Sequence, residues 1–139
     1  MLKYLIPLTV VVFLSCTSEP KKIKIGSDQC HFCKMTIMEE NFACQTITKK
    51  GKVYVYDDLK CQIKEKRSQE KSLSGAQFFV SNYLDDGAFL NFEQAFFIES
   101  SEFKSPMAGN IAAVATQSEA EVLASEKNGA IINIENAFE

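Results

Sequence analysis

The chemistry of this chain is concentrated in the stretch Cys30–Met35, which reads CHFCKM. Cys30 and Cys33 are three positions apart, and Met35 follows two residues later. A thiolate and a thioether are soft donors that select Cu(I), whereas zinc takes four nitrogen or thiolate ligands and hard ions take oxygen. If the chain runs extended after Cys33, the sulfur atoms of Cys33 and Met35 point to the same side and can meet at one ion. The methionine therefore favours copper over zinc.

Two other residues of this stretch leave alternatives open. Cys30 could be a further ligand that tightens the site, or it could form a disulfide with Cys33 that abolishes the site. His31, the only histidine of the chain, points away from Cys33 in an extended run. We therefore expect a solvated or partner-facing imidazole, with a role as metal ligand as the alternative.

A distant sulfur donor, Met107, lies in the polar loop Lys104–Asn110. Its apolar side chain has no amphipathic pattern to join there, and Pro106 stiffens the chain before it. A methionine that fills a gap in the core is the alternative. Together with CHFCKM, Met107 is better explained as a copper ligand. Met38 is expected to pack against other apolar side chains instead.

Four cysteines outside the N-terminal segment allow two other functions. Cys30, Cys33, Cys44 and Cys61 could form a structural zinc module. A thiol-disulfide oxidoreductase of the cell envelope is the other alternative, and it needs a low pKa at Cys33. We expect Cys44 and Cys61 to be buried free cysteines in a strand and a helix. An enzyme is not expected, because no third group is in view to orient the histidine as a base.

The N-terminal segment has the features of a bacterial lipoprotein signal. Its start is short and basic, the run Tyr4–Leu14 is apolar but too short to span a bilayer, and Cys16 follows. This pattern resembles a lipobox, in which Cys16 is lipidated and becomes the mature N-terminus. Residues 1–15 are then a signal peptide and residues 16–27 a lipidated tether. The protein is expected in the cell envelope, facing the periplasm, at the outer membrane; an uncleaved anchor or a signal cut elsewhere is the alternative.

The remaining chain, residues 28–139, is long enough for one compact domain. The formal net charge of −3 at pH 7 does not favour nucleic acid as a partner. The pattern of apolar residues predicts an α+β fold of two successive small units, each with strands and one helix. The two units are expected at about residues 28–73 and 76–139.

The elements follow from local signals in the sequence. Asp57 or Asp58 is expected to cap the first helix, and Thr116 or Ser118 the second. The helices are expected to end near Lys71 and at Asn128-Gly129. The predicted strands are Ile23–Gly26, Phe42–Thr48, Val53–Tyr56, Gln77–Tyr83, Phe89–Ile98, Ile111–Ala115 and Ala130–Ile134.

Several separated motifs together resemble the NosL family. They are CHFCKM, the hairpin end Val55–Asp58, the late segment Ser105–Gly109 followed by Ile111–Ala113, and the helix end Asn128-Gly129. NosL proteins are lipid-anchored copper-binding accessory proteins of nitrous-oxide reductase. The resemblance implies a NosL-like fold, Cu(I) as the bound ion, and delivery of copper for assembly of the copper centres of that reductase during denitrification. The implied partners are nitrous-oxide reductase and its associated membrane transporter complex.

The resemblance also implies which residues hold copper. The Cys-Gly-Met core of the family falls on Cys33, Lys34 and Met35, and its late methionine falls on Met107. Lys34 replaces the usual glycine, which disfavours a tight turn with positive φ at this position. Copper held by one thiolate and one or two thioethers is bound at low coordination, with an open position for a ligand of the acceptor. Transfer can then proceed by stepwise ligand exchange.

Overall fold

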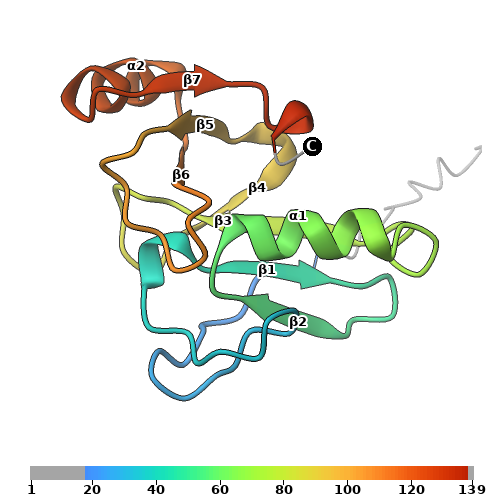
Figure 1. Cartoon of the computed structure of the whole chain (residues 1–139). Coiled ribbons are helices and arrows are strands. Elements are labelled where there is room, and N and C mark those ends of the chain that lie inside the picture. Colours follow the sequence, from blue (N-terminus) through green and yellow to red (C-terminus); the bar gives the residue numbers. More distant parts are fainter. Residues whose placement is uncertain (1–17, 138–139) are drawn as a thin grey trace, which may run out of the picture.

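The computed structural model describes residues 18–137, which form two antiparallel sheets that pack against each other, each accompanied by one helix (Figure 1). In this view the first sheet and helix α1 lie below the second sheet and helix α2. The predicted signal peptide and the predicted lipidation site Cys16 lie outside the described residues. The predicted α+β fold with two helix-bearing units is confirmed.

The first sheet contains four strands in the order β2-β1-β3-β4. Its β-branched and aromatic residues favour extended backbone. The predicted hairpin forms, with Gly51 at a φ of 81° in its turn and Cys44 opposite Tyr56 at its open end. The strands are β1 Cys44–Ile47, β2 Val53–Tyr56, β3 Gln77–Ser81 and β4 Phe89–Asn91, and the short 3₁₀ helix η1, Glu40–Phe42, precedes β1.

Helix α1, Leu59–Ser68, begins directly after β2 and packs against β1 and β2. Asp58 is its N-cap, because the Asp58 carboxylate accepts a hydrogen bond from the backbone N–H of Lys60. The helix buries Cys61 and Ile63. One of the two predicted caps is thus confirmed, and Cys61 is fixed near the N-terminal end of α1.

The chain passes from the first sheet to the second within the segment that was predicted as the single strand Phe89–Ile98. After β4, the side chain of Asn91 accepts a hydrogen bond from the N–H of Glu93, and the 3₁₀ helix η2, Phe92–Gln94, follows. β4 pairs with β3 in the first sheet, whereas β5 pairs with β6 in the second sheet. The sheets therefore divide at residues 92–95 and not near residue 75, because apolar periodicity cannot tell which sheet a strand joins.

The second sheet has the strand order β6-β5-β7 and packs against α2. Thr116 and Glu119 form a reciprocal capping box at the start of α2, as the sequence predicted for Thr116. Among its elements, β5 is Phe96–Glu99, β6 is Ile111–Val114, α2 is Gln117–Glu126, β7 is Ala130–Ile132 and the 3₁₀ helix η3 is Ile134–Asn136.

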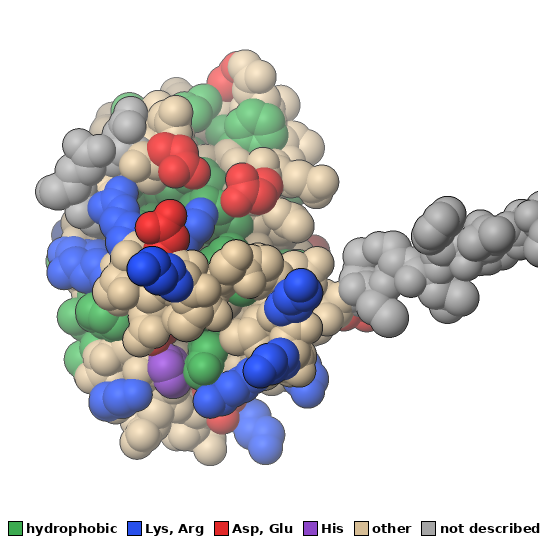
Figure 2. All heavy atoms as spheres, turned by 90° about the vertical axis from the view of Figure 1, so that its right-hand side faces the viewer, with side chains coloured by type: hydrophobic (Ala, Val, Ile, Leu, Met, Phe, Trp, Pro, Cys, Tyr) green, Lys and Arg blue, Asp and Glu red, His purple; other side chains and the backbone are tan. Residues whose placement is uncertain are grey.

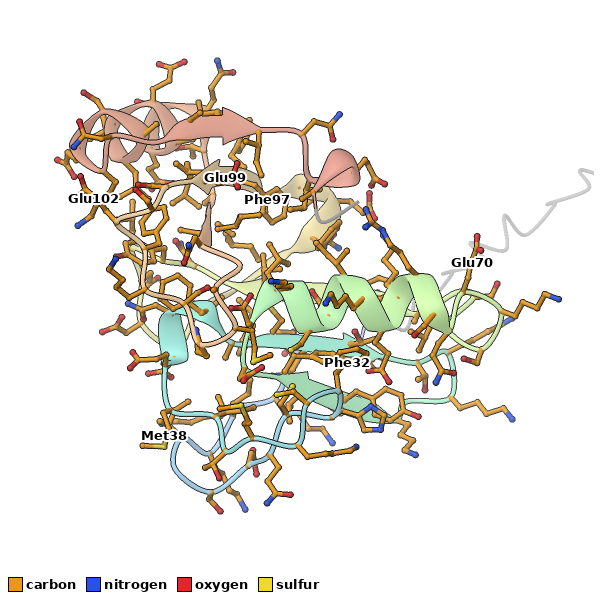
Figure 3. The ribbon with its side chains drawn as sticks, viewed as in Figure 1. Phe32, Met38, Glu70, Phe97, Glu99 and Glu102 are labelled. Atoms are coloured by element: carbon orange, nitrogen blue, oxygen red, sulfur yellow. The ribbon has the colours of Figure 1, made fainter. Side chains whose placement is uncertain are left out.

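One buried cluster joins the two sheets. The rings of Phe92 and Phe97 lie 5.3 Å apart between centroids, and both belong to the cluster that contains Tyr56 of β2. Phe97 points from β5 toward α1 (Figure 3). Because Cys30 and Cys61 belong to the same cluster, the core of the protein extends to the cysteines.

The segment 18–27, which was expected to be a tether, contacts strand β1 of the first sheet. The N–H of Lys21 donates to Oε1 of Gln45 at 2.9 Å, and Ile23 is buried. The predicted strand Ile23–Gly26 does not form, and a turn spans residues 25–27 instead. Within residues 18–137, none of the helices has the length and apolar character needed to cross a bilayer.

Candidate metal centre

The stretch Cys30–Met35 forms a tight turn, not the extended run assumed from the sequence. Its flanking residues pair as an isolated antiparallel bridge. Within the turn, the N–H of Cys30 donates to the carbonyl of Met35 at 2.8 Å, and the N–H of Lys34 donates to the carbonyl of Cys30 at 2.9 Å. Cys33 and Met35 are therefore not same-side positions of one strand, and the geometric argument that paired their sulfur atoms was wrong.

Lys34 adopts the left-handed conformation that a lysine in place of glycine was expected to disfavour, with a φ of 67°. For an L-residue this region costs about 1 kcal/mol or more relative to right-handed backbone. The ammonium group of Lys34 donates a hydrogen bond to the carbonyl oxygen of His31, which offsets part of this cost. The turn thus keeps the backbone that glycine would allow.

Four side chains from two segments converge at this turn. Cys30 and Cys33 come from the turn, whereas Asp57 and Cys61 come from the junction of β2 with α1 and from the first turn of α1. The sulfur atoms and a carboxylate oxygen all lie within 4.8 Å of one another. This cysteine–aspartate group can supply three sulfur donors and one oxygen donor to a single ion. The structure has free thiols at all three cysteines of the group, and Cys30 forms no disulfide with Cys33.

Three members of the cysteine–aspartate group are buried and one is partly exposed. Cys30, Cys61 and Asp57 are at most 1% exposed, whereas Cys33 is half-buried. The Cys33 thiol donates to Oδ2 of Asp57 at 3.3 Å. Among the described residues, Oδ1 of Asp57 is buried without a hydrogen-bond partner. A buried carboxylate oxygen with no donor is unfavourable, so the group fits a bound cation better than an empty core.

Contacts within the group separate the pKa values of its thiols. A hydrogen bond from the Cys61 thiol lowers the pKa of Cys30 to about 6, because it stabilises the thiolate. The same contact and burial raise the pKa of Cys61. Burial raises the pKa of Cys33 to about 11, and hydrogen bonds involving Cys30 and Asp57 add to the rise. These contacts therefore favour the thiolate form at Cys30 over the thiolate form at Cys33 or Cys61.

The two predicted methionine ligands occupy different environments. Met35 is 52% exposed at the end of the turn. Met107 is partly buried and packs against the same core cluster as Cys33. The backbone N–H of Met107 donates to Oδ2 of Asp58 at 2.9 Å, next in sequence to Asp57. Met107 and Cys33 thus belong to neighbouring parts of the molecule, although they come from opposite halves of the chain.

His31 lies outside the cysteine–aspartate group. Its Nδ1 atom lies 2.8 and 3.0 Å from the two carboxylate oxygens of Glu65, and its ring centroid is 4.1 Å from that of Tyr54. The His31 side chain is 38% exposed, and Figure 2 shows the histidine at the surface, with basic side chains on either side. The imidazole joins the turn to α1 and β2, as a structural contact does.

Two further sulfur residues also lie outside the group. Cys44 is buried in β1, where its thiol is 3.5 Å from the carbonyl oxygen of Phe42, so the predicted four-cysteine zinc set is not assembled. Met38, which was expected to pack, is 62% exposed and extends from the lower left of the molecule in Figure 3.

The sequence did not predict Asp57 or Cys61 as copper ligands. Asp57 or Asp58 was expected to cap a helix, and Cys61 was expected to be a buried free cysteine, joined with Cys30 and Cys33 only in the alternative zinc set. Helical spacing does not link these two residues, because Asp57 lies before the N-cap Asp58 and is outside the helix. Local sequence therefore could not show that Asp57 and Cys61 meet the Cys30–Met35 turn.

The fold and the site together define a class of protein: a small two-sheet α+β protein with a thiol-rich candidate metal centre between its N-terminal turn and its first helix. The model of the NosL family matches residues 22–137, and the chain belongs to that family. The family membership predicted from the motifs is thus confirmed.

A solved structure supports the assignment of the fold. The chain is similar to the structure described as the copper chaperone NosL from Shewanella denitrificans, with a TM-score of 0.69 and 19% sequence identity. The similarity covers 85% of this chain and 96% of that chain. At this level of identity the match shows the shared fold. A comparison with curated proteins gave no match.

Proposed function

We propose that this protein binds one Cu(I) ion and carries it to an acceptor protein. The observation that supports the proposal best is the convergence of three cysteine sulfur atoms with Asp57 in one buried group. Thiolates are soft ligands, and Cu(I) is among the ions that they select. Membership of the NosL family and structural similarity to a protein described as a copper chaperone support the same function.

The proposed ligands are Cys33 and Cys30, with Cys61 added to the set, and Met107 as the thioether from the far half of the chain. Met35, which is half-exposed, is the ligand best placed for exchange with solvent or with an acceptor. A carboxylate is a hard donor, so Asp57 is expected to accept hydrogen bonds from thiols more than to bind Cu(I).

Transfer is proposed to begin at Met35, the most exposed of the proposed ligands, and to continue at Cys33, the half-buried thiol of the group. A soft ligand of the acceptor binds the copper ion, one bond from the ion to a sulfur of this protein breaks, and the remaining bonds are exchanged in the same way. The ion remains Cu(I) throughout, and each thiolate that is released can take up a proton. This mechanism needs no oxidant and no reductant.

The proposed destination is nitrous-oxide reductase, through the membrane transporter complex associated with it. The proposed location is the periplasmic face of the cell envelope, where Cys16 carries the lipid anchor. Family membership is the support for these assignments. Cells that lack the protein should then accumulate nitrous-oxide reductase with a reduced copper content, and a Cys33→Ser variant should not restore it. Full copper loading of the reductase in such cells would contradict this destination.

Zinc is the competing ion, because three thiolates and one carboxylate also form an acceptable tetrahedral zinc set. The two ions can be separated by anaerobic titration of the full chain in detergent against a chromophoric chelator. We expect one tightly bound Cu(I) per chain and weaker binding of Zn(II). A structural zinc site would give the reverse order, and the fold would be lost on chelation while Met35 and Met107 remained dispensable.

An oxidoreductase is not favoured by the environment of the thiols. That function needs a reactive thiolate at the accessible cysteine, but the pKa of Cys33 is raised to about 11. The thiol with a lowered pKa is that of Cys30, which is fully buried. Reduction of a model disulfide by the metal-free protein should therefore be no faster than reduction by free cysteine.

A further inference from the structure

The carboxylate of Asp58 connects the start of α1 with the loop that carries Met107. Its Oδ1 atom accepts the hydrogen bond from Lys60 N–H that caps the helix, at 2.8 Å. Its Oδ2 atom accepts from the Ser105 hydroxyl at 2.7 Å, from Met107 N–H at 2.9 Å and from Gly109 N–H at 3.4 Å. One side chain thus binds two segments that lie 47 to 51 positions apart.

The loop is shaped to enclose this carboxylate. A Cβ atom at Gly109 would lie 2.4 Å from Oδ1 of Asp58, so glycine is required for the close approach. Ala108 adopts a φ of 52°, in the left-handed region that L-residues rarely occupy. The Ser105 hydroxyl also accepts from Asn110 N–H at 2.8 Å, which closes the loop around its own anchor.

Asp58 is 1% exposed, and a buried carboxylate is tolerated only when hydrogen-bond donors surround it. An N-cap needs only one carboxylate oxygen, because a single oxygen accepts the hydrogen bond from the helix start. Water can hydrate the free N–H groups at a helix start that is exposed. The three donors on the other oxygen come from the Met107 loop. The degree of burial and the number of donors therefore exceed what an N-cap alone needs.

The position of Asp58 relates the loop to the candidate metal centre. Asp57, its neighbour in sequence, belongs to the cysteine–aspartate group, and Cys61 lies three residues further along the chain. We propose that Asp58 is a positioning residue that holds the Met107 loop so that the Met107 thioether faces the copper ion bound by the cysteines. This inference rests on the proposed function and adds to it a buried residue that joins the two parts of the ligand set, next to the Lys60 ammonium group, which donates to the Met107 carbonyl oxygen at 3.3 Å.

The substitution Asp58→Asn leaves one acceptor oxygen where the structure uses two. Asparagine is as good an N-cap as aspartate, but its single carbonyl oxygen cannot serve both Lys60 N–H and the three donors of the loop. Ser105→Ala weakens the loop contact from the other side and leaves the cap unchanged. Replacement of a residue that supports a metal ligand lowers metal affinity by about 10- to 100-fold. We expect a loss in that range for Asp58→Asn and a smaller loss for Ser105→Ala.

A double-mutant cycle with Met107→Leu tests whether Asp58 acts through Met107. Cu(I) affinity is measured anaerobically on the full chain in detergent for the wild type, both single variants and the double variant. If Asp58 positions Met107, Asp58→Asn lowers affinity strongly in the wild type and by less than about threefold when leucine already replaces Met107. Equal losses in both backgrounds would mean that Asp58 acts through charge or stability, and would overturn the inference.

A spectroscopic readout and a matched control complete the test. In protein labelled with ¹³C at the methionine methyl groups, the Met107 signal should shift on addition of Cu(I) in the wild type and remain unshifted in Asp58→Asn. Thr116→Ala removes the N-cap of α2, which makes none of the contacts of Asp58, and should lower stability without a change in Cu(I) affinity. A Met107 signal that shifts equally in Asp58→Asn would overturn the inference.

The two proposals fail in different ways. If wild-type protein binds no Cu(I), the proposed function is wrong. If wild-type protein binds Cu(I) with a Met107 shift but the double-mutant cycle is additive, the proposed function stands and the role of Asp58 is wrong.

Discussion

The Cys33 thiol lies 3.3 Å from Oδ2 of Asp57 and donates a hydrogen bond to it. This contact joins the Cys30–Met35 turn to the junction between β2 and α1. Cys61 lies in the first turn of α1, four positions after Asp57, and its sulfur joins the two sulfurs of the Cys30–Met35 turn. The site is therefore a product of two segments, and variants of each segment give separate tests.

Replacement of Cys61 by serine tests whether α1 contributes a ligand. Loss of a sulfur donor should lower Cu(I) affinity by at least about tenfold, the lower limit seen even for residues that only support a ligand. Cys44→Ser is the matched control, because Cys44 is also buried but lies outside the cysteine–aspartate group. Competition titration with a Cu(I) chelator measures both variants. Equal affinity of wild type and Cys61→Ser would exclude Cys61 from the ligand set.

The two candidate methionines should contribute unequally. Met107 is partly buried against the core, whereas Met35 is 52% exposed. Met107→Leu keeps the volume of the side chain and removes the thioether, so it should lower Cu(I) affinity more than Met35→Leu does. The same titration ranks the two variants, and a larger effect at Met35 would refute this order.

His31→Ala should affect stability more than copper binding. The substitution removes the contact with Glu65 and the tilted ring contact with Tyr54. Because the imidazole is 38% exposed, we expect a loss of about 1 kcal/mol in the free energy of unfolding. Urea unfolding measures this loss, and titration should still give one Cu(I) per chain. A lower stoichiometry would show that the ring binds the metal.

Cys44 should make the metal-free protein less stable at high pH. Burial raises the pKa of the Cys44 thiol well above its ordinary value of 9.0. Above pH 9.0 the Cys44 thiol is deprotonated in the unfolded chain but stays protonated in the folded chain. The free energy of unfolding therefore falls by up to about 1.4 kcal/mol per pH unit. Cys44→Ala removes this contribution. Urea unfolding under reducing conditions, from about pH 8 to pH 10, should therefore show a flatter pH dependence for the variant, and parallel curves would contradict the prediction.

Lys34→Gly should stabilise the turn. Lys34 has a φ of 67°, which glycine adopts without steric cost. We expect a gain of up to about 1 kcal/mol in the free energy of unfolding, reduced by loss of the contact between Lys34 and His31. Lys50→Gly is the matched control, since Lys50 has no positive φ and its replacement should destabilise the protein. If Lys34→Gly is as destabilising as the control, the left-handed conformation carries no strain.

Local structure was largely predictable from neighbouring residues. The hairpin of β1 and β2, the Asp58 cap and the Thr116 cap all depend on hydrogen bonds or side-chain preferences within a few positions. The division of the segment Phe89–Ile98 between two sheets was not predictable in this way. Both parts of that segment have the apolar pattern of a strand, and only packing against other strands decides their partners.

The sequence by itself determined the types of donor available to the site and the motifs that indicate the NosL family. It also supplied the glycine at position 109 and the adjacent aspartates, without revealing their use. Only the tertiary structure decided that Asp57 and Cys61 join Cys30 and Cys33, and that Asp58 holds the Met107 loop. The physical reason is distance along the chain: Cys33 meets Asp57 across 24 positions and Met107 meets Asp58 across 49. The first contact forms when the N-terminal turn packs on the junction of β2 and α1, and the second forms when the loop before β6 packs on the start of α1.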